Sequence, residues 1–368
     1  MRVIRVAVIC FLGFTGVAKA QTNFFIQDIH VNPDSSVTIT WPAVPQIPYH
    51  VMFADSPTGM WQDFSDGTVA AGSNVSSLAY TDTNGLAVTQ RFYKVRKTRA
   101  QLIMALVLDR SGSMGCEPPC GSGGAFVLSN AVSSFIDNFD DSADMVGMSS
   151  FGSTASLDVP MEQPFKSDIT AAANAMNFGG RTFAEGGLQI GFNQVNNTSA
   201  PPGQNAVKVI VFFTDGYANT FQTNFSCRVA PINLGQSDPP IGLPTNAGAP
   251  WSYEFIDPAG GSDPPCTSTT FQSIDGTTKT ISQNNQNVWY EGQLHALSVA
   301  NQIRSANILI YSIGLGAGLN QDFLRNIAND PAGSLYNINQ ISGEAVFAPD
   351  ASQLQAVFQS IATKVLSQ

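Results

Sequence analysis

Three apolar runs in the second part of the sequence limit the folds that are open to this chain. Residues 102–108, 207–213 and 308–313 are each almost entirely apolar. A strand has this composition when both of its faces are buried, as in a parallel sheet covered by helices. Segments with helical periodicity, such as 125–139 and 291–305, lie between these runs. The alternation predicts an α/β fold, a doubly wound and mostly parallel sheet with helices on both faces.

Further elements complete this alternating pattern. The sequence predicts strands at 144–151, at 153–159 as an antiparallel edge strand, and at 334–338. It predicts four more helices, at 166–176, 184–195, 320–329 and 351–366. Open α/β sheets bind ligands beyond the carboxyl ends of their strands, so functional residues are expected in the loops that follow the strands.

Residues 21–98 show a different pattern, without helical periodicity. Short alternating runs with turn signals between them lie at 24–31, 36–41, 49–54 and 90–97. This spacing predicts a small all-β sandwich in front of the α/β domain, which we place at 99–368. The order of four aromatic residues resembles that of fibronectin type III-like modules: Trp41, Tyr49, Trp61 and Tyr93. We expect these residues to fill the sandwich core, and an exposed aromatic binding strip is the alternative.

The N-terminus has the three parts of a secretory signal peptide. Arg2 and Arg5 form a positive region, residues 6–18 are apolar but too short to span a bilayer comfortably, and Ala18-Lys19-Ala20 is a small-x-small cleavage site. We therefore expect residues 1–20 to be removed and the protein to be secreted, periplasmic or held at the cell surface. An uncleaved membrane anchor is the alternative. No membrane span is expected after cleavage.

The charge balance argues against some classes of partner. The chain has 17 Lys and Arg against 27 Asp and Glu, a net charge of −10, and loss of the signal would remove three of the basic residues. Such an acidic chain is a poor partner for nucleic acid, which we exclude. It also needs a specific device to hold an acidic ligand, and a bound cation is one such device.

Oxygen-bearing side chains gather in the loops at one end of the predicted sheet. Asp109, Ser111 and Ser113 follow the first apolar run, and alternate residues of an extended loop share a side. Thr182 lies in a Gly-Gly-Arg-Thr segment before a predicted helix, and Asp215 follows the second apolar run in a Thr-Asp-Gly segment. Two carboxylates and three hydroxyls should therefore meet at this end.

The segments Asp-x-Ser-x-Ser, Gly-x-Thr and Thr-Asp-Gly, in this order, resemble the metal-ion-dependent adhesion site of von Willebrand factor A domains. The likeness extends over about 101–366. It implies one divalent cation, magnesium or else manganese or calcium, with the hydroxyls as direct ligands and the aspartates anchoring the ion and its waters. The implied residues are Asp109, Ser111, Ser113, Thr182 and Asp215. An open coordination position would take an Asp or Glu carboxylate of a partner protein.

Four cysteines remain once the signal is removed: Cys116, Cys120, Cys227 and Cys266. An even number in an exported protein predicts two disulfide bonds. Proximity in the sequence favours Cys116–Cys120 and Cys227–Cys266, while the other two connectivities and a four-cysteine zinc site remain alternatives.

A long insertion, about 217–288, leaves the predicted domain directly after Asp215. It is rich in Gly, Pro, Ser, Thr and Asn, and is far longer than an ordinary strand-to-helix loop. Because it leaves from the edge that carries the predicted metal, we expect it to form a wall of the site and to select the partner. An unstructured decoration held by one disulfide is the alternative.

The motifs favour a binding protein over an enzyme. Position 111 holds serine where a haloacid dehalogenase-type phosphatase needs a second aspartate, and His295 is the only histidine in the predicted α/β domain. The expected function is cation-dependent protein binding or adhesion. The alternative is a structural or assembly component of a cell-surface or pilus system in which the metal is mainly structural. The sequence around Asp109 and Asp215 also resembles that of the A domains of bacterial tight-adherence pilus assembly proteins.

Overall fold

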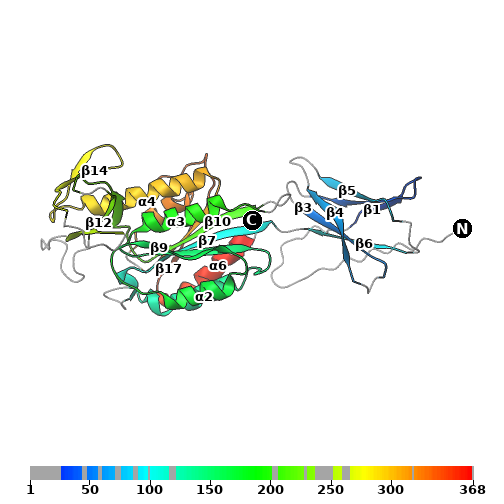
Figure 1. Ribbon diagram of the computed structural model, residues 1–368, viewed down its shortest axis with the longest axis horizontal. Coiled ribbons are helices and arrows are strands. Elements are labelled where there is room, and N and C mark those ends of the chain that lie inside the picture. Colours follow the sequence, from blue (N-terminus) through cyan, green and yellow to red (C-terminus); the bar gives the residue numbers. More distant parts are fainter. Residues whose placement is uncertain are drawn as a thin grey trace. The chain divides into compact units, whose positions relative to one another are not determined.

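The computed structural model describes residues 26–43, 48–56, 60–70, 76–85, 90–97, 100–115, 122–200, 206–227, 230–236, 252–258, 266–316 and 319–366 (Figure 1). The chain divides into two compact units. One contains residues 1–101 and 200–206, and the other contains 102–199 and 207–368. The predicted signal, together with Cys116 and Cys120, lies outside the described residues.

The first unit contains two antiparallel sheets of three strands each. One has the order β1 (Asp28–Val31), β2 (Val37–Pro42), β5 (Ser77–Asp82), and the other β4 (Gln62–Ala70), β3 (Pro48–Ala54), β6 (Phe92–Lys97). Side chains of β2 alternate between buried and partly buried, as expected of a strand with one face in a core. Trp41, Tyr49 and Tyr93 are buried in the apolar core of this unit, so for these three residues the core interpretation is confirmed.

The second unit is built on one mostly parallel six-stranded sheet, as predicted. Its order is β17-β16-β10-β7-β8-β9, and β9 is an antiparallel edge strand. The strands are β7 (Gln101–Asp109), β8 (Met145–Phe151), β9 (Ala155–Glu162), β10 (Ala206–Thr214), β16 (Leu309–Leu315) and β17 (Glu344–Ala348). Every residue of β7 and β16 is buried, which explains their apolar runs.

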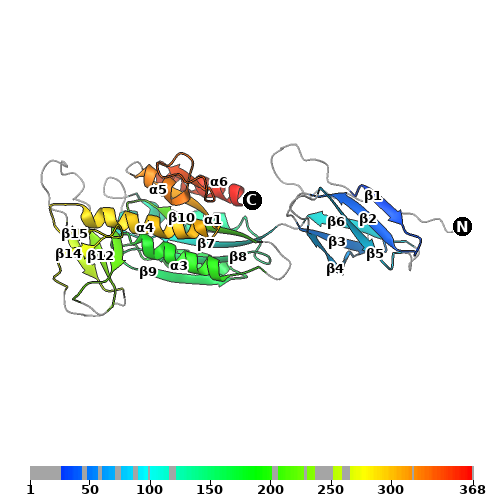
Figure 2. The same cartoon turned by 90° about the horizontal axis from the view of Figure 1, so that it is seen from above.

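Helices cover both faces of this sheet. They are α1 (Leu128–Ile136), α2 (Lys166–Ala175), α3 (Ala184–Asn197), α4 (Asn287–Ser305), α5 (Gln321–Ala328) and α6 (Leu354–Leu366). Helices α2 and α6 lie on one side of the sheet, and α3 and α4 on the other (Figures 1 and 2). None of the described helices combines the length and the apolar character that crossing a membrane requires. The predicted α/β fold is confirmed.

The strand predicted at 334–338 is wrong. This segment forms turns, and the last strand of the sheet is β17, paired with β16. The backbone N–H groups of Ser334, Leu335 and Asn337 do not join a strand ladder. They donate to side chains of α5 and its C-cap: Asp322, Asn326 and Asn329. Side-chain acceptors that satisfy these donors favour a turn over a strand.

The described part of the insertion is folded. It contains a three-stranded antiparallel sheet of β11 (Thr220–Thr223), β12 (Ile232–Gln236) and β13 (Tyr253–Ile256), and a hairpin of β14 (Thr270–Gln272) and β15 (Thr278–Thr280). It has an apolar core of its own: Phe221, Phe225, Ile232, Leu234, Cys266, Phe271, Ile281 and Val288. Cys227 and Cys266 form a disulfide bond, with their Cα atoms 5.6 Å apart. Tyr253 and Phe255 pack against this core, while Trp251 lies outside the described residues.

Candidate metal site

Asp109 joins the carboxyl ends of two neighbouring strands. It is the last residue of β7 and is 0% exposed. One carboxylate oxygen accepts the Ser111 N–H at 2.7 Å, and the other accepts the hydroxyl of Thr214, at the end of β10, at 2.5 Å. The first hydrogen bond bends the chain sharply after β7, and the second fixes the ends of β7 and β10 to each other.

Ser111, Ser113 and Asp215 form a chain of contacts beside Asp109. The two serine hydroxyl oxygens lie 3.1 Å apart, and the Ser113 hydroxyl donates to Asp215 Oδ1 at 2.7 Å. Asp215 Oδ2 is buried and has no hydrogen-bond partner among the described residues. Four of the five predicted residues are therefore brought together by direct contacts, and one buried carboxylate oxygen among them is unpartnered.

Thr182 lies in a loop that is bound to the Asp109–Ser113 segment. Gly112 N–H donates to Gly180 O at 3.0 Å, and Gly179 N–H donates to Arg110 O at 2.8 Å. Gly180 has φ +81°, and a Cβ there would lie 2.4 Å from the Ser153 hydroxyl oxygen, so this close approach requires glycine. Thr182 N–H donates to Asn219 Oδ1 at 2.8 Å. Within the described part of the chain, its own hydroxyl makes no hydrogen bond to the other four residues.

Burial raises the pKa of both carboxyl groups, and the charge of Asp215 adds to the effect on Asp109. Burial, and then the charge of Asp215, raises the pKa of Asp109 to about 7. Burial also raises the pKa of Asp215. Among the residues that the structure describes, no basic side chain forms an ion pair with either carboxylate. A buried and a partly buried carboxylate close together without a cationic partner are costly, and a bound cation would remove that cost.

The donor set fits a hard divalent cation. It consists of carboxylate and hydroxyl oxygens, which magnesium, manganese and calcium prefer, and it contains no thiolate or imidazole. Among the residues that the structure describes, no group of three or more His, Cys, Asp or Glu side chains is arranged to hold a metal ion. The geometry therefore agrees with a site built mainly from hydroxyls and two carboxylates.

The comparison with protein families decides the class of the second unit. The model of the von Willebrand factor type A domain matches residues 104–230, which include most of β7, all of β10 and all five predicted site residues. The chain contains a von Willebrand factor type A (VWA) domain. A comparison with curated protein sequences found no match.

Several solved structures are similar to the chain at low sequence identity. The PilB minor pilin from Streptococcus sanguinis is 14% identical, with 95% of this chain and 80% of that chain covered and a TM-score of 0.49. The vWF domain of the type V pili tip protein Mfa5 from Porphyromonas gingivalis is 15% identical, with 73% and 96% covered and a TM-score of 0.45. Manganese-loaded TRAP protein from Plasmodium vivax is 16% identical, with 72% and 74% covered and a TM-score of 0.39.

Three residues that support the site in the VWA domain were not assigned from the sequence. Thr214 donates to Asp109, Asn219 holds Thr182, and Ser122 donates its N–H to Ser113 O at 3.0 Å. The Ser122 hydroxyl partly offsets the rise in the pKa of Asp215 that burial causes. Thr214 belongs to the Thr-Asp-Gly segment and was available as a signal. Asn219 and Ser122 lie outside any recognisable motif.

His295 belongs to a buried ionic network between α3, α4 and the insertion. Its Nδ1 lies 2.9 Å from Glu185, and its Nε2 lies 3.5 Å from Glu291. Glu291, which is fully buried, also accepts from Lys279 at 2.9 Å. The network joins α3, α4 and the β14–β15 hairpin, so it fastens the insertion to the domain. The spacing of Glu291 and His295, four residues apart in a helix, was the available signal.

This network predicts a loss of stability at alkaline pH. Burial alone would lower the pKa of His295, but hydrogen bonds and charges from Glu185 and Glu291 raise it to about 9 from 6.5. Because the pKa of His295 is higher in the folded state, its protonated ring adds up to about 3 kcal/mol to the free energy of unfolding. This contribution is complete below pH 6.5 and is lost as the pH rises to 9. Urea denaturation of wild type and His295→Gln at pH 6 and pH 9 measures it. The difference between the two proteins should shrink at pH 9, and a difference independent of pH would contradict the prediction.

Proposed function

We propose that this protein binds an acidic group of a partner protein through one divalent cation held by the VWA domain. The observation that carries the proposal is the pair of buried Asp109 and partly buried Asp215, which forms no ion pair with a basic side chain among the described residues and includes a buried carboxylate oxygen without a hydrogen-bond partner. A cation placed there would balance both charges. The open position of such a cation would attract a carboxylate from outside, although the protein itself is acidic.

Each predicted residue has a role in this proposal. Ser111, Ser113 and Thr182 would supply hydroxyl oxygens, while Asp109 and Asp215 would anchor the ion and its waters. Neutral hydroxyl ligands leave most of the positive charge uncompensated, and an ion of this kind binds an anionic ligand strongly. Magnesium is the ion that we propose, and manganese or calcium can be bound by the same oxygens.

We also propose that the insertion forms a wall of the site and selects the partner. Its strands are fastened to the loops that carry the site residues. Arg181, next to Thr182, pairs with Glu254 at 2.9 Å, and Asn233 Nδ2 donates to the Ser153 carbonyl at 3.0 Å. Gln236 N–H donates to the Asn219 carbonyl at 3.0 Å. Because of these contacts, a partner that binds the cation would also touch a folded surface of the insertion.

Export follows the same proposal. Residues 1–20 would direct the chain out of the cytoplasm, and the Cys227–Cys266 disulfide is of a kind that persists in oxidising compartments. We propose that the protein acts in the medium, in the periplasm or at the cell surface. There it would work as an adhesion or assembly component, with a binding role and not a catalytic one.

Affinity capture from the native surface or medium tests this function. The protein should retain specific partners in magnesium and lose them in EDTA, and Ser111→Ala should lose them in magnesium as well. Ser305→Ala, which replaces an exposed serine of α4, is the matched control and should behave as wild type. A variant without residues 224–285 should still bind the ion but lose the partners.

Two outcomes would contradict the proposal. If Ser111→Ala lowers the melting temperature but keeps every partner, the metal has a structural role only. If partners survive the loss of residues 224–285, the insertion does not select them.

A further inference from the structure

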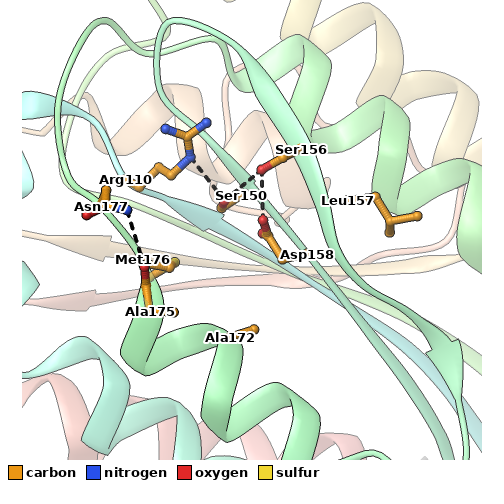
Figure 3. Close-up of a pocket in the computed structure, with 9 residues that line it drawn as sticks. All are labelled: Arg110, Ser150, Ser156, Leu157, Asp158, Ala172, Ala175, Met176 and Asn177. Carbon is orange, nitrogen blue, oxygen red and sulfur yellow. Dashed lines mark hydrogen bonds between the residues drawn. The ribbon is translucent and has the colours of Figure 1, made fainter.

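A cavity of about 550 Å³ opens between the edge strand β9 and the end of α2 (Figure 3). One wall lies on the sheet and carries Arg110, Ser150, Ser156 and Asp158. The opposite wall belongs to the last turns of α2 and contributes Ala172, Ala175 and Met176. The cavity thus has a polar side and an apolar side.

The polar wall occupies a position where the rest of the sheet is apolar. On the same face, Leu106 and Leu108 of β7 and Met148 of β8 are buried in the core beneath α1, α2 and α6. Alternate residues of a strand share a face, so Arg110 and Ser150 continue these rows. The apolar face therefore ends in a polar wall whose members Arg110, Ser156 and Asp158 are only partly buried.

The two charges of this wall are held apart by hydroxyl groups. Arg110 Nε donates to Ser150 Oγ at 3.1 Å, Ser150 and Ser156 Oγ atoms lie 3.3 Å apart, and the Ser156 hydroxyl donates to Asp158 Oδ1 at 2.8 Å. No ion pair joins Arg110 and Asp158, which both belong to the described residues. Asp158 Oδ2 is buried and lacks a hydrogen-bond partner in the described structure.

We propose that this cavity binds a zwitterionic ligand of the amino-acid type. Its carboxylate pairs with the Arg110 guanidinium, its ammonium pairs with the Asp158 carboxylate, and an apolar side chain packs on Ala172, Ala175 and Met176. Each of the three hydrogen bonds along the wall spans at most 3.3 Å, so the guanidinium Nε and the carboxylate lie within about 10 Å of each other. An amino acid with its charges about 3 Å apart and a hydrogen bond of about 2.8 Å at each end bridges such a distance.

Both a free amino acid and a short peptide with charged ends offer this chemistry. The inference does not depend on the metal, because no predicted metal ligand lines the cavity. Arg110 nevertheless lies between Asp109 and Ser111, so the cavity adjoins the Asp109–Ser113 segment that carries three of the predicted metal ligands.

Isothermal titration of the full chain with four compounds tests the chemistry. L-leucine and L-leucyl-L-leucine represent the two sources, and the one that binds more tightly identifies the source. N-acetyl-L-leucine lacks the ammonium, and L-leucinamide lacks the carboxylate. Each should bind roughly tenfold or more weakly than L-leucine, since a charge-assisted pair is lost. The inference is overturned if neither zwitterion binds at millimolar concentration, or if the blocked compounds bind as tightly as L-leucine.

Asp158→Asn tests the assigned carboxylate. The amide oxygen still accepts from Ser156, so the strand should fold, while affinity for the zwitterion should fall at least roughly tenfold. Asp137→Asn, which removes an exposed charge at the end of α1, is the matched control and should bind as wild type. Unchanged affinity in Asp158→Asn would overturn the assignment. Titrations repeated in EDTA should be unaltered, so failure of the metal site and failure of this cavity remain distinguishable.

Discussion

Magnesium is expected to raise the melting temperature of the VWA domain in the wild-type protein by several degrees and to leave Asp215→Asn unchanged. A ligand at 100 times its Kd adds about 2.7 kcal/mol to the free energy of unfolding. For a domain of this size that corresponds to about 5–10 °C. The substitution keeps an acceptor for the Ser113 hydroxyl but removes one of the two carboxylate charges that would anchor the ion. The ion affinity should therefore fall by at least roughly a hundredfold.

The same melting experiments, repeated in EDTA, distinguish stabilisation by a bound metal from stabilisation by side-chain packing. In EDTA, Asp215→Asn should be at least as stable as wild type, because it removes the charge that repels the buried Asp109 carboxylate. Asp137→Asn, an exposed change of the same charge, should respond to magnesium as wild type does. If Asp215→Asn gained the same stability from magnesium as the wild type, the proposed site would be wrong.

The central sheet was predictable because its strands are buried on both faces. The runs at 102–108 and 207–213 differ by only a residue or two from β7 and β10. The last strand was not predictable in the same way. Leu335 and Ile338 gave 334–338 an apolar appearance, yet they are 64% and 80% exposed, while β17 is a short edge strand of mixed composition. Apolar content indicates burial only on average.

The candidate site shows the same division between local and distant information. The spacing of Asp109, Ser111 and Ser113 is a local property, and the structure places these residues together. The contact of Thr214 with Asp109 depends on the pairing of strands that are 105 residues apart in sequence. Nothing in a single sequence states which strands will be neighbours.

The insertion was the least predictable part of the chain. Its composition is typical of loops, and its strands are only three to five residues long. Its core depends on aromatic residues far apart in the sequence, such as Phe221 and Phe271, whose ring centroids lie 4.9 Å apart. A few aromatic contacts and one disulfide bond are enough to fold a segment that composition alone would assign to disorder.

Glu291→Ala is expected to be one of the most destabilising single substitutions outside the apolar core. The Glu291 side chain is 0% exposed and accepts the Ser273 hydroxyl at 2.8 Å, the Ile274 N–H at 2.6 Å and the Lys279 ammonium at 2.9 Å. Burial alone would raise its pKa, but these bonds and the one from His295 lower it to about 2. Removing the carboxylate leaves Lys279 and His295 without their shared anion, at a cost of about 3–5 kcal/mol.

Because of the position of Glu291, the loss of stability in Glu291→Ala should be confined at first to the insertion. Its partners Ser273, Ile274 and Lys279 all belong to the β14–β15 hairpin, so the hairpin should detach before the sheet unfolds. Hydrogen exchange should show faster exchange of the Ile274 amide, with the amides of β7 unaffected under the same conditions. Urea denaturation gives the overall cost.

Glu254→Ala is the matched control, because Glu254 also fastens the insertion to the domain. Its carboxylate pairs with Arg181 at 2.9 Å, but the side chain is 46% exposed. A solvent-exposed ion pair contributes less than about 1 kcal/mol, since water screens the charges and both side chains lose freedom. If both substitutions lower the free energy of unfolding by the same amount, the burial of Glu291 does not strengthen the attachment of the insertion. If Glu291→Ala alone releases the hairpin, the network of Glu291, Lys279 and His295 holds the folded insertion beside the proposed metal site.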